Sequence, residues 1–135
     1  MPLIEWNDNY SVGIETADTH HKKLISMINS LHEAMSKGES NEVITKILSA
    51  LTVYTDKHFK YEEKLFLTHN YPRYKEHKKE HDELIRQVED LNEKFKASTT
   101  SISIEVMKLL NTWLTDHIQK TDKQYTEFLN SKGVK

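Results

Sequence analysis

The sequence predicts an all-α protein, an up-down-up-down four-helix bundle with an extended N-terminal arm. Apolar residues recur at helical spacing in four segments, and short stretches of turn-forming residues separate these segments. The chain has 135 residues, and four helices of about twenty residues or slightly more, joined by short loops, would use up this length. We therefore expect a single domain that spans residues 1–135.

Residues 1–17 are expected to form the arm, because apolar residues are mixed there with Asn, Asp, Ser and Gly without a helical period. Trp6 in this arm is interpreted as a packing residue. Asp18 is a good N-cap residue, so the first helix is expected over about 19–37, and Gly38 supplies its C-terminal stop.

The first helix carries two neighbouring histidines, and periodicity alone does not decide between them. His21 precedes one apolar stripe by three residues, whereas His20 fits an alternative stripe that shares some of the same residues. Both histidines therefore remain candidates for the core face. The stripe that follows His21 contains Leu24, Ile28, Leu31 and Met35.

The second helix is expected over about 41–69, and its core line carries a histidine. Heptad steps fall at positions 44, 51, 58 and 65, so His58 lies on the core line and Glu62 follows one turn later. A carboxylate buried on an apolar face is costly unless it is paired or binds a metal ion. This pair therefore indicates a site rather than a solvated face.

The third helix is expected over about 72–97, because Pro72 suits the first turn of a helix. Two histidines lie on its apolar line. Since residues four apart share a helix face, His77 and His81 can bind one metal ion or two adjacent ions. The full line contains Tyr74, His77, His81, Leu84, Val88, Leu91 and Phe95.

The stretch 98–103 is expected to be the last loop, and the fourth helix should cover about 103–130. His117 ends an apolar line, and Asp122 follows five residues later. Five residues are about 140° out of phase on an ideal α-helix. Either Asp122 reaches around the helix, or a π-type bulge corrects the phase.

These polar residues are expected to meet in one layer of the bundle. Counted from the loops, those on neighbouring helices differ in depth by one or two residues, which is about 1.5 to 3 Å at the rise of an α-helix. Such convergence is much harder to obtain by chance than a single pair of histidines. The donors are His21, with His20 as its rival, and His58, Glu62, His77, His81, His117 and Asp122.

The donor set predicts a pair of metal ions. Five imidazoles and two carboxylates exceed the four ligands of zinc, and calcium or magnesium sites prefer oxygen alone. Two adjacent octahedral ions have twelve coordination positions, and these donors with one bridging oxide or hydroxide leave one position vacant for a small ligand. Non-haem iron fits these donors and reacts with dioxygen, while manganese remains possible.

Composition excludes several classes of function. The 19 basic and 21 acidic residues give a formal net charge of −2, which argues against nucleic acid or an anionic membrane as the partner. The start lacks signal-peptide features, and no apolar run is long enough to span a bilayer, so no membrane insertion is expected. The chain has no cysteine, which excludes iron–sulfur clusters and makes a cytoplasmic protein the default.

With these donors in this order, the sequence resembles the hemerythrins, specifically the short single-domain bacterial kind. The resemblance covers nearly the whole chain through the segments SVGIETADTHHKKL, HFKYEEKLF, YPRYKEHKKEH and WLTDHIQKTDKQY. It implies a four-helix bundle that holds two irons bridged by oxide or hydroxide and binds dioxygen reversibly.

The resemblance also implies roles for particular residues. It assigns His77, His81 and His117 to one iron, and His21 and His58 to the iron that takes dioxygen, with Glu62 and Asp122 as bridges. It favours His21 over His20, because Asp18-x-x-His21-x-x-Leu24 matches the family pattern and His20 falls where members usually have Gln. The walls of the dioxygen pocket would be Phe59, Trp113, Leu114 and Ile118.

Other polar residues are assigned no ligand role. His32 and His69 are interpreted as boundary or helix-end histidines, and Glu63 and Asp116 are expected to face water. Tyr125 lies near Asp122 in the sequence, where it either packs in the core or donates a hydrogen bond to the site.

The predicted function is reversible dioxygen binding for storage, delivery or sensing, without enzymatic activity and with an unknown protein partner. Oxidase-type di-iron sites are carboxylate-rich and use Glu-x-x-His pairs, which this sequence lacks. The alternatives are a di-iron enzyme that reduces nitric oxide or peroxide, and a signalling module that senses oxygen.

Overall fold

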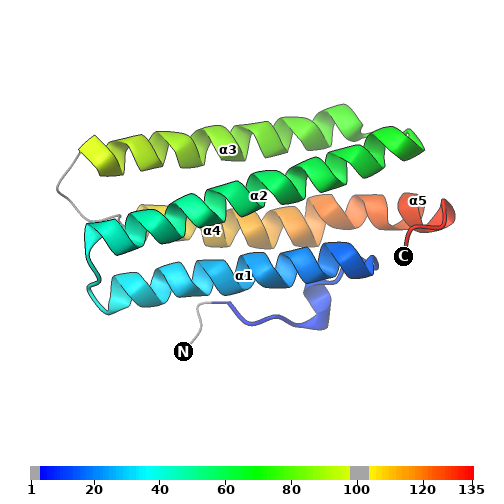
Figure 1. Cartoon of the computed structure of the whole chain (residues 1–135). Coiled ribbons are helices and arrows are strands. Elements are labelled where there is room, and N and C mark those ends of the chain that lie inside the picture. Colours follow the sequence, from blue (N-terminus) through cyan, green and yellow to red (C-terminus); the bar gives the residue numbers. More distant parts are fainter. Residues whose placement is uncertain (1–3, 98–103) are drawn as a thin grey trace.

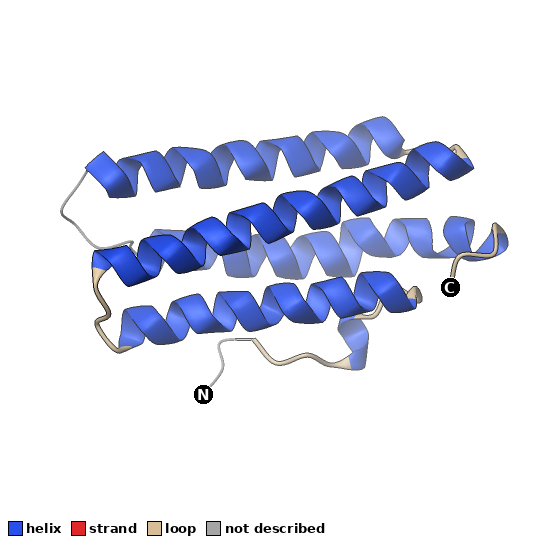
Figure 2. Ribbon diagram, in the orientation of Figure 1, coloured by secondary structure: helices blue, strands red, loops and turns tan. Residues whose placement is uncertain are grey.

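The computed structural model describes residues 4–97 and 104–135, and four long helical rods dominate it (Figure 1). Neighbouring rods run antiparallel, and the described residues contain helices and loops but no strand (Figure 2). The predicted four-helix bundle is thus confirmed. The first three rods are α1 (Glu15–Ser36), α2 (Asn41–His69) and α3 (Tyr74–Ala97). The fourth consists of α4 (Ile104–Asp116), η2 (His117–Thr121), η3 (Asp122–Tyr125) and α5 (Thr126–Ser131).

The ends of the first two rods follow from local sequence. Gly38 adopts a φ of 69° directly after α1, a left-handed conformation that glycine adopts without steric cost. Ser40 caps α2 by accepting a hydrogen bond from the Val43 N–H at 3.3 Å. At the far end of α2, Asn70 also adopts a left-handed conformation, and Pro72 lies in the turn. The helix α3 therefore begins at Tyr74, two residues later than expected.

The start of α1 differs from the expectation, and the reason is the role of Asp18. The helix begins at Glu15, so Asp18 lies in its first turn and is not the N-cap. The Asp18 carboxylate accepts hydrogen bonds from the Ser11 hydroxyl at 2.6 Å and the Val12 N–H at 2.8 Å. This carboxylate therefore ties the arm to the helix, and the helix begins four residues earlier than predicted.

The arm runs along α1 and reaches the end of the fourth rod. Asn29 of α1 exchanges two hydrogen bonds with the backbone of Ile4, at 2.9 and 2.8 Å. The Val12 carbonyl accepts a hydrogen bond from the Thr126 hydroxyl at 2.5 Å. Trp6 packs against the core, as expected for a structural residue.

Buried polar side chains interrupt the apolar core. Apolar residues fill it toward the α1–α2 loop, with Leu31 and Leu48, and toward the α2–α3 turn, with Phe66 and Leu129. The predicted loop 98–103 lies outside the described residues, as do the side chains at positions 91, 95 and 106. Among the described helices, none is long and apolar enough to cross a membrane. The buried polar residues are His21, Thr55, His58, Glu62, Glu63, His77, His81, His117 and Asp122.

Candidate metal centre

The structure brings the seven candidate donors together in one buried cluster. No member of the cluster is more than 3 % exposed. Their donor atoms form two groups, each with atoms within 4.8 Å of one another, and the two groups share Glu62 and Asp122. The larger group adds His77, His81 and His117, and the smaller adds His21 and His58.

Helical geometry explains why neighbouring donors from one helix reach the same point. His58 and Glu62 are four residues apart on α2, and His77 and His81 are four apart on α3, so each pair shares a face. His21 points from α1 into the cluster, while the adjacent His20 lies at its edge and is partly buried. Of the two rival histidines, the structure therefore places His21 inside.

A π-helix in the fourth rod brings His117 and Asp122 onto the same face. His117–Thr121 forms one π turn, and the Asp122 N–H bonds to the His117 carbonyl five residues back. This wider turn inserts one extra residue, so both His117 and Asp122 face the cluster. Of the two alternatives that the sequence left open, the structure has the bulge.

The larger donor group gathers around one oxygen of Asp122. The Nε2 atoms of His77 and His117 each lie 2.9 Å from Asp122 Oδ1. His81 Nε2 lies 3.3 Å from Glu62 Oε1 and 3.2 Å from His117 Nε2. Three imidazoles and two carboxylates thus face one small volume.

The smaller donor group uses the other oxygen of Asp122. His21 Nε2 lies 3.1 Å from Asp122 Oδ2, and His58 Nε2 lies 3.4 Å from Glu62 Oε1. The two imidazole Nε2 atoms are themselves 3.0 Å apart. Because Asp122 presents a different oxygen to each group, its carboxylate lies between them as a bridge would.

These contacts fit metal ligation better than a hydrogen-bonded core. Glu62 Oε1 and both Asp122 carboxylate oxygens are buried without a hydrogen bond of acceptable geometry in the described structure. Imidazole nitrogens approach each other at 3.0 and 3.2 Å. Adjacent ligands of an octahedral ion lie about 3 Å apart when each is about 2.1 Å from the metal. The donors are therefore spaced as ligands that share an ion.

The charges of the cluster also call for a cation. Burial opposes ionisation of Glu62 and Asp122, but the surrounding imidazoles outweigh it and hold both pKa values below their ordinary range. Burial likewise opposes protonation of His117, yet Asp122 raises its pKa to about 10. Burial dominates at His58, whose pKa falls to about 3. Two buried carboxylates need positive charge, which protonated His117 supplies in part without metal and which a bound metal ion supplies when the imidazoles are neutral ligands.

The structure contradicts the expectation that Glu63 faces water, because this residue is buried and only 6 % exposed. It follows Glu62 around the surface of α2 toward α3, and its Oε2 lies 3.0 Å from His81 Nδ1. A carboxylate that holds the second nitrogen of a ligand imidazole orients the ring. Periodicity within α2 marks one core line only, so it could not reveal a contact that depends on α3.

Glu80 is a second residue near the cluster that sequence reasoning missed. It lies on α3 with its side chain 47 % exposed, and Oε1 lies 3.5 Å from His117 Nδ1. This is longer than a good hydrogen bond. The same oxygen accepts a hydrogen bond from the Thr121 hydroxyl at 3.1 Å. No signal in the sequence distinguishes Glu80 from the other charged residues of α3.

Tyr125 combines the two roles that the sequence left open. Its side chain is 1 % exposed, and its hydroxyl donates a hydrogen bond to Glu62 Oε2 at 2.7 Å. His32 and His69 belong to neither donor group, and Asp116 is exposed as expected.

The four residues expected to wall a pocket differ in burial and in their contacts with the cluster. Phe59, Leu114 and Ile118 are at most 2 % exposed, and Trp113 is partly buried. The Phe59 ring stacks on His81 with centroids 3.8 Å apart, and the Trp113 ring stacks on His117 at 4.3 Å. Apolar and aromatic side chains thus cover two of the imidazoles.

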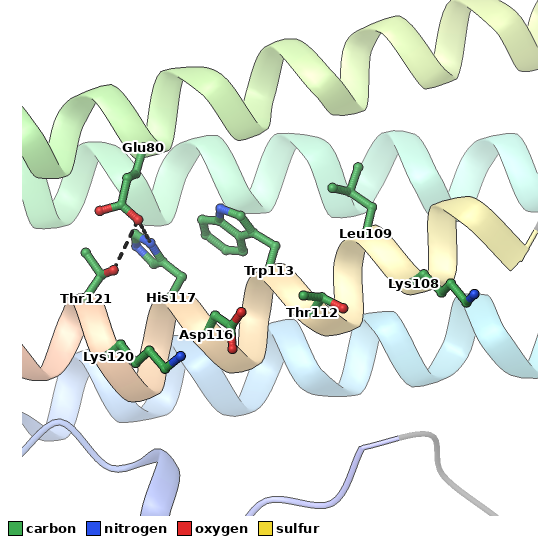
Figure 3. Close-up of a pocket in the computed structure, with 9 residues that line it drawn as sticks. All are labelled: Glu80, Lys108, Leu109, Thr112, Trp113, Asp116, His117, Lys120 and Thr121. Atoms are coloured by element: carbon green, nitrogen blue, oxygen red, sulfur yellow. Dashed lines mark hydrogen bonds and ion pairs between the residues drawn. The ribbon is translucent and has the colours of Figure 1, made fainter.

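A groove of about 600 Å³ opens on the outer side of this region (Figure 3). Figure 3 shows Glu80 reaching from α3 toward His117 and Thr121, with Trp113 beside His117. Of the four predicted wall residues, only Trp113 lines this groove. The lining consists of Glu80, Lys108, Leu109, Thr112, Trp113, Asp116, His117, Lys120 and Thr121.

Comparisons with known proteins agree on one family. A family model for the hemerythrin HHE cation binding domain matches residues 12–129. A bacteriohemerythrin of Methylococcus capsulatus is 34% identical over 132 residues, covering 97% of this chain and 100% of that protein. One of Pseudomonas aeruginosa is 34% identical over 127 residues, covering 94% and 82%. A crystal structure of wild-type hemerythrin aligns with a TM-score of 0.88 and 34% identity, covering 94% and 98%.

The contact between Tyr125 and Glu62 generates a prediction about stability. Tyr125→Phe should lower the free energy of unfolding of the metal-free protein by about 1 to 3 kcal/mol, because it removes a hydrogen bond to a buried carboxylate. Urea unfolding measures this change. Tyr71→Phe is the matched control, since the buried Tyr71 hydroxyl has no hydrogen-bond partner in the described structure. Equal losses in the two variants would contradict the role of the hydroxyl.

Proposed function

The chain belongs to the hemerythrin family, and on this premise we propose that it binds dioxygen reversibly at a non-haem di-iron centre, for oxygen storage, delivery or sensing. One observation carries the proposal: two groups of buried donors share the carboxylates of Glu62 and Asp122. A shared pair of carboxylates between unequal sets of imidazoles suits two adjacent ions better than one.

The proposed ligands divide between the two irons as the two donor groups do. His77, His81 and His117 would hold one iron, and His21 and His58 would hold the other. Glu62 and Asp122 would bridge them together with an oxide or hydroxide. The Asp122 contacts support this, because Oδ1 lies 2.9 Å from His77 and Oδ2 lies 3.1 Å from His21.

The unequal numbers of histidines would leave one coordination position free on the His21 and His58 side. When bound, the iron pair supplies the electrons and the vacant position that dioxygen uptake needs. Five neutral imidazoles add no anionic charge to the irons, and this favours the ferrous pair over very high-valent states. Reversible binding rather than oxidation chemistry, and so a carrier rather than an enzyme, follows from this balance.

The surrounding side chains would protect the bound gas. Phe59, Leu114 and Ile118 are almost fully buried, so they exclude bulk water and anions from the cluster. Trp113 stacks on His117, and both side chains line the outer groove. Slow oxidation to an inert ferric state is the expected benefit of this apolar cover.

The direct test is iron analysis combined with absorption spectroscopy. The protein should hold about two irons per chain, as its donor count implies. After anaerobic reduction, exposure to air should give a coloured adduct that deoxygenation reverses. Stopped-flow mixing with a reductant present separates a carrier from an enzyme. Catalytic consumption of dioxygen, nitric oxide or peroxide, without a stable adduct, would contradict the proposal.

The ligand assignment predicts unequal effects of two histidine substitutions. His77→Ala should lose iron or leave it in an altered site, because it removes one of the proposed ligands. His32→Ala is the matched control and should keep the iron content of the wild type, since His32 lies outside both donor groups. Metal analysis of the purified variants measures the difference. Equal iron loss would refute the assignment.

The apolar cover predicts a change in the lifetime of the oxygenated protein. Leu114→Ala should hasten autoxidation, because it opens a cavity beside the cluster that water can enter. Leu48→Ala is the control, since it truncates another buried leucine about 15 Å along α2 from His58. Both variants should lose about 2 to 5 kcal/mol of stability. An unchanged lifetime in Leu114→Ala would rule out a protective role for this side chain.

A further inference from the structure

His20 contacts the cluster from outside, and we propose that it positions His58 as a metal ligand and keeps that ligand a weak electron donor. The inference rests on the proposed function, because it takes His58 as a ligand of iron. His20 belongs to neither donor group. Its role would therefore be to act through His58 and not on the metal itself.

The contact between His20 and His58 joins the Nδ1 atoms of the two rings. His20 Nδ1 lies 2.8 Å from His58 Nδ1, while His58 Nε2 faces the cluster, 3.0 Å from His21 Nε2. The His58 ring is thus held from both sides. Within residues 4–97 and 104–135, His20 is the one hydrogen-bond partner of His58 Nδ1.

Metal ligation fixes the direction of this hydrogen bond. An imidazole that binds a metal through Nε2 carries its proton on Nδ1, and that N–H needs an acceptor when the ring is buried. His58 is 2 % exposed, so water cannot substitute easily. His58 therefore donates and His20 Nδ1 accepts, which places the proton of His20 on its Nε2.

Two tyrosines of α2 pack against the His20 ring and restrict its movement. Its ring packs edge-on against Tyr54 with centroids 6.0 Å apart and against Tyr61 at 4.8 Å. Tyr54 and Tyr61 lie about one turn before and after His58 on the same helix. His20 thus contacts both aromatic rings and meets the edge of the His58 ring, with centroids 5.0 Å apart.

The partner of His58 differs in charge from the partners of two other imidazoles. His81 Nδ1 faces the carboxylate of Glu63 at 3.0 Å, and His117 Nδ1 faces Glu80 at 3.5 Å. A carboxylate partner makes an imidazole a stronger electron donor to its metal. A neutral imidazole does so less, and as a result the His21 and His58 iron is held more easily in the ferrous state that dioxygen binding requires.

Three substitutions at His20 separate its effects on position and charge. His20→Leu removes the acceptor, and it should weaken binding of one of the two irons about 10- to 100-fold. His20→Gln keeps a neutral acceptor and should restore binding. His20→Glu supplies a charged acceptor, so the midpoint potential of the centre should become more negative and autoxidation faster. His32→Leu on the same helix is the matched control.

Iron titration and potentiometry of the loaded protein give the readouts. Weak binding in His20→Leu that Gln restores, with a lower potential in His20→Glu, is the expected result. Wild-type affinity and potential in His20→Leu would overturn the inference and leave the proposed function intact. If His20→Leu does not fold, equal potentials in the Gln and Glu variants would overturn it. A wild-type chain that holds fewer than two irons would overturn both.

Discussion

The whole structure depends on the cost of burying two carboxylates. Glu62 and Asp122 lie in the middle of an apolar bundle at 1 % exposure or less. Among the residues that the structure describes, the polar groups that approach their carboxylates are imidazoles and one tyrosine hydroxyl. Such charges destabilise a core unless positive charge compensates them. The helices must therefore deliver their histidines to one level. This requirement explains the matched depths of the four rods and the π turn that rotates Asp122 into the same layer as His117.

The same cluster is asymmetric in two ways that bear on its function. Three histidines face one side of the shared carboxylates and two face the other, so in the proposed centre one metal position would have more free coordination positions than the other. The outer partners differ as well, because a carboxylate holds His81 whereas a neutral ring contacts His58. Under the proposed function, coordination and charge together would direct ligand binding to the His21 and His58 side. The buried side chains of Phe59, Leu114 and Ile118 would then keep water away from it.

Sequence periodicity predicts the bundle and the candidate donors because both obey single-helix rules. Residues four apart share a face, and a buried carboxylate on that face requires a partner. The features that the sequence does not reveal depend on two elements at once. Asp18 binds the arm, and Glu63 reaches His81 across the α2–α3 interface. The contact of His20 with His58 likewise needs the packing of α1 on α2. The five-residue spacing shows that Asp122 is out of phase with His117 on an α-helix, but it does not decide between a π-type bulge and a side chain that reaches around the helix.

Anomalous diffraction from crystals of the iron-loaded protein tests the central claim most directly. The account predicts two iron peaks in each chain, both in contact with the carboxylates of Glu62 and Asp122. Three histidines should ligate one iron, and His21 and His58 the other. A single iron peak, or two peaks that do not share these carboxylates, would contradict the account.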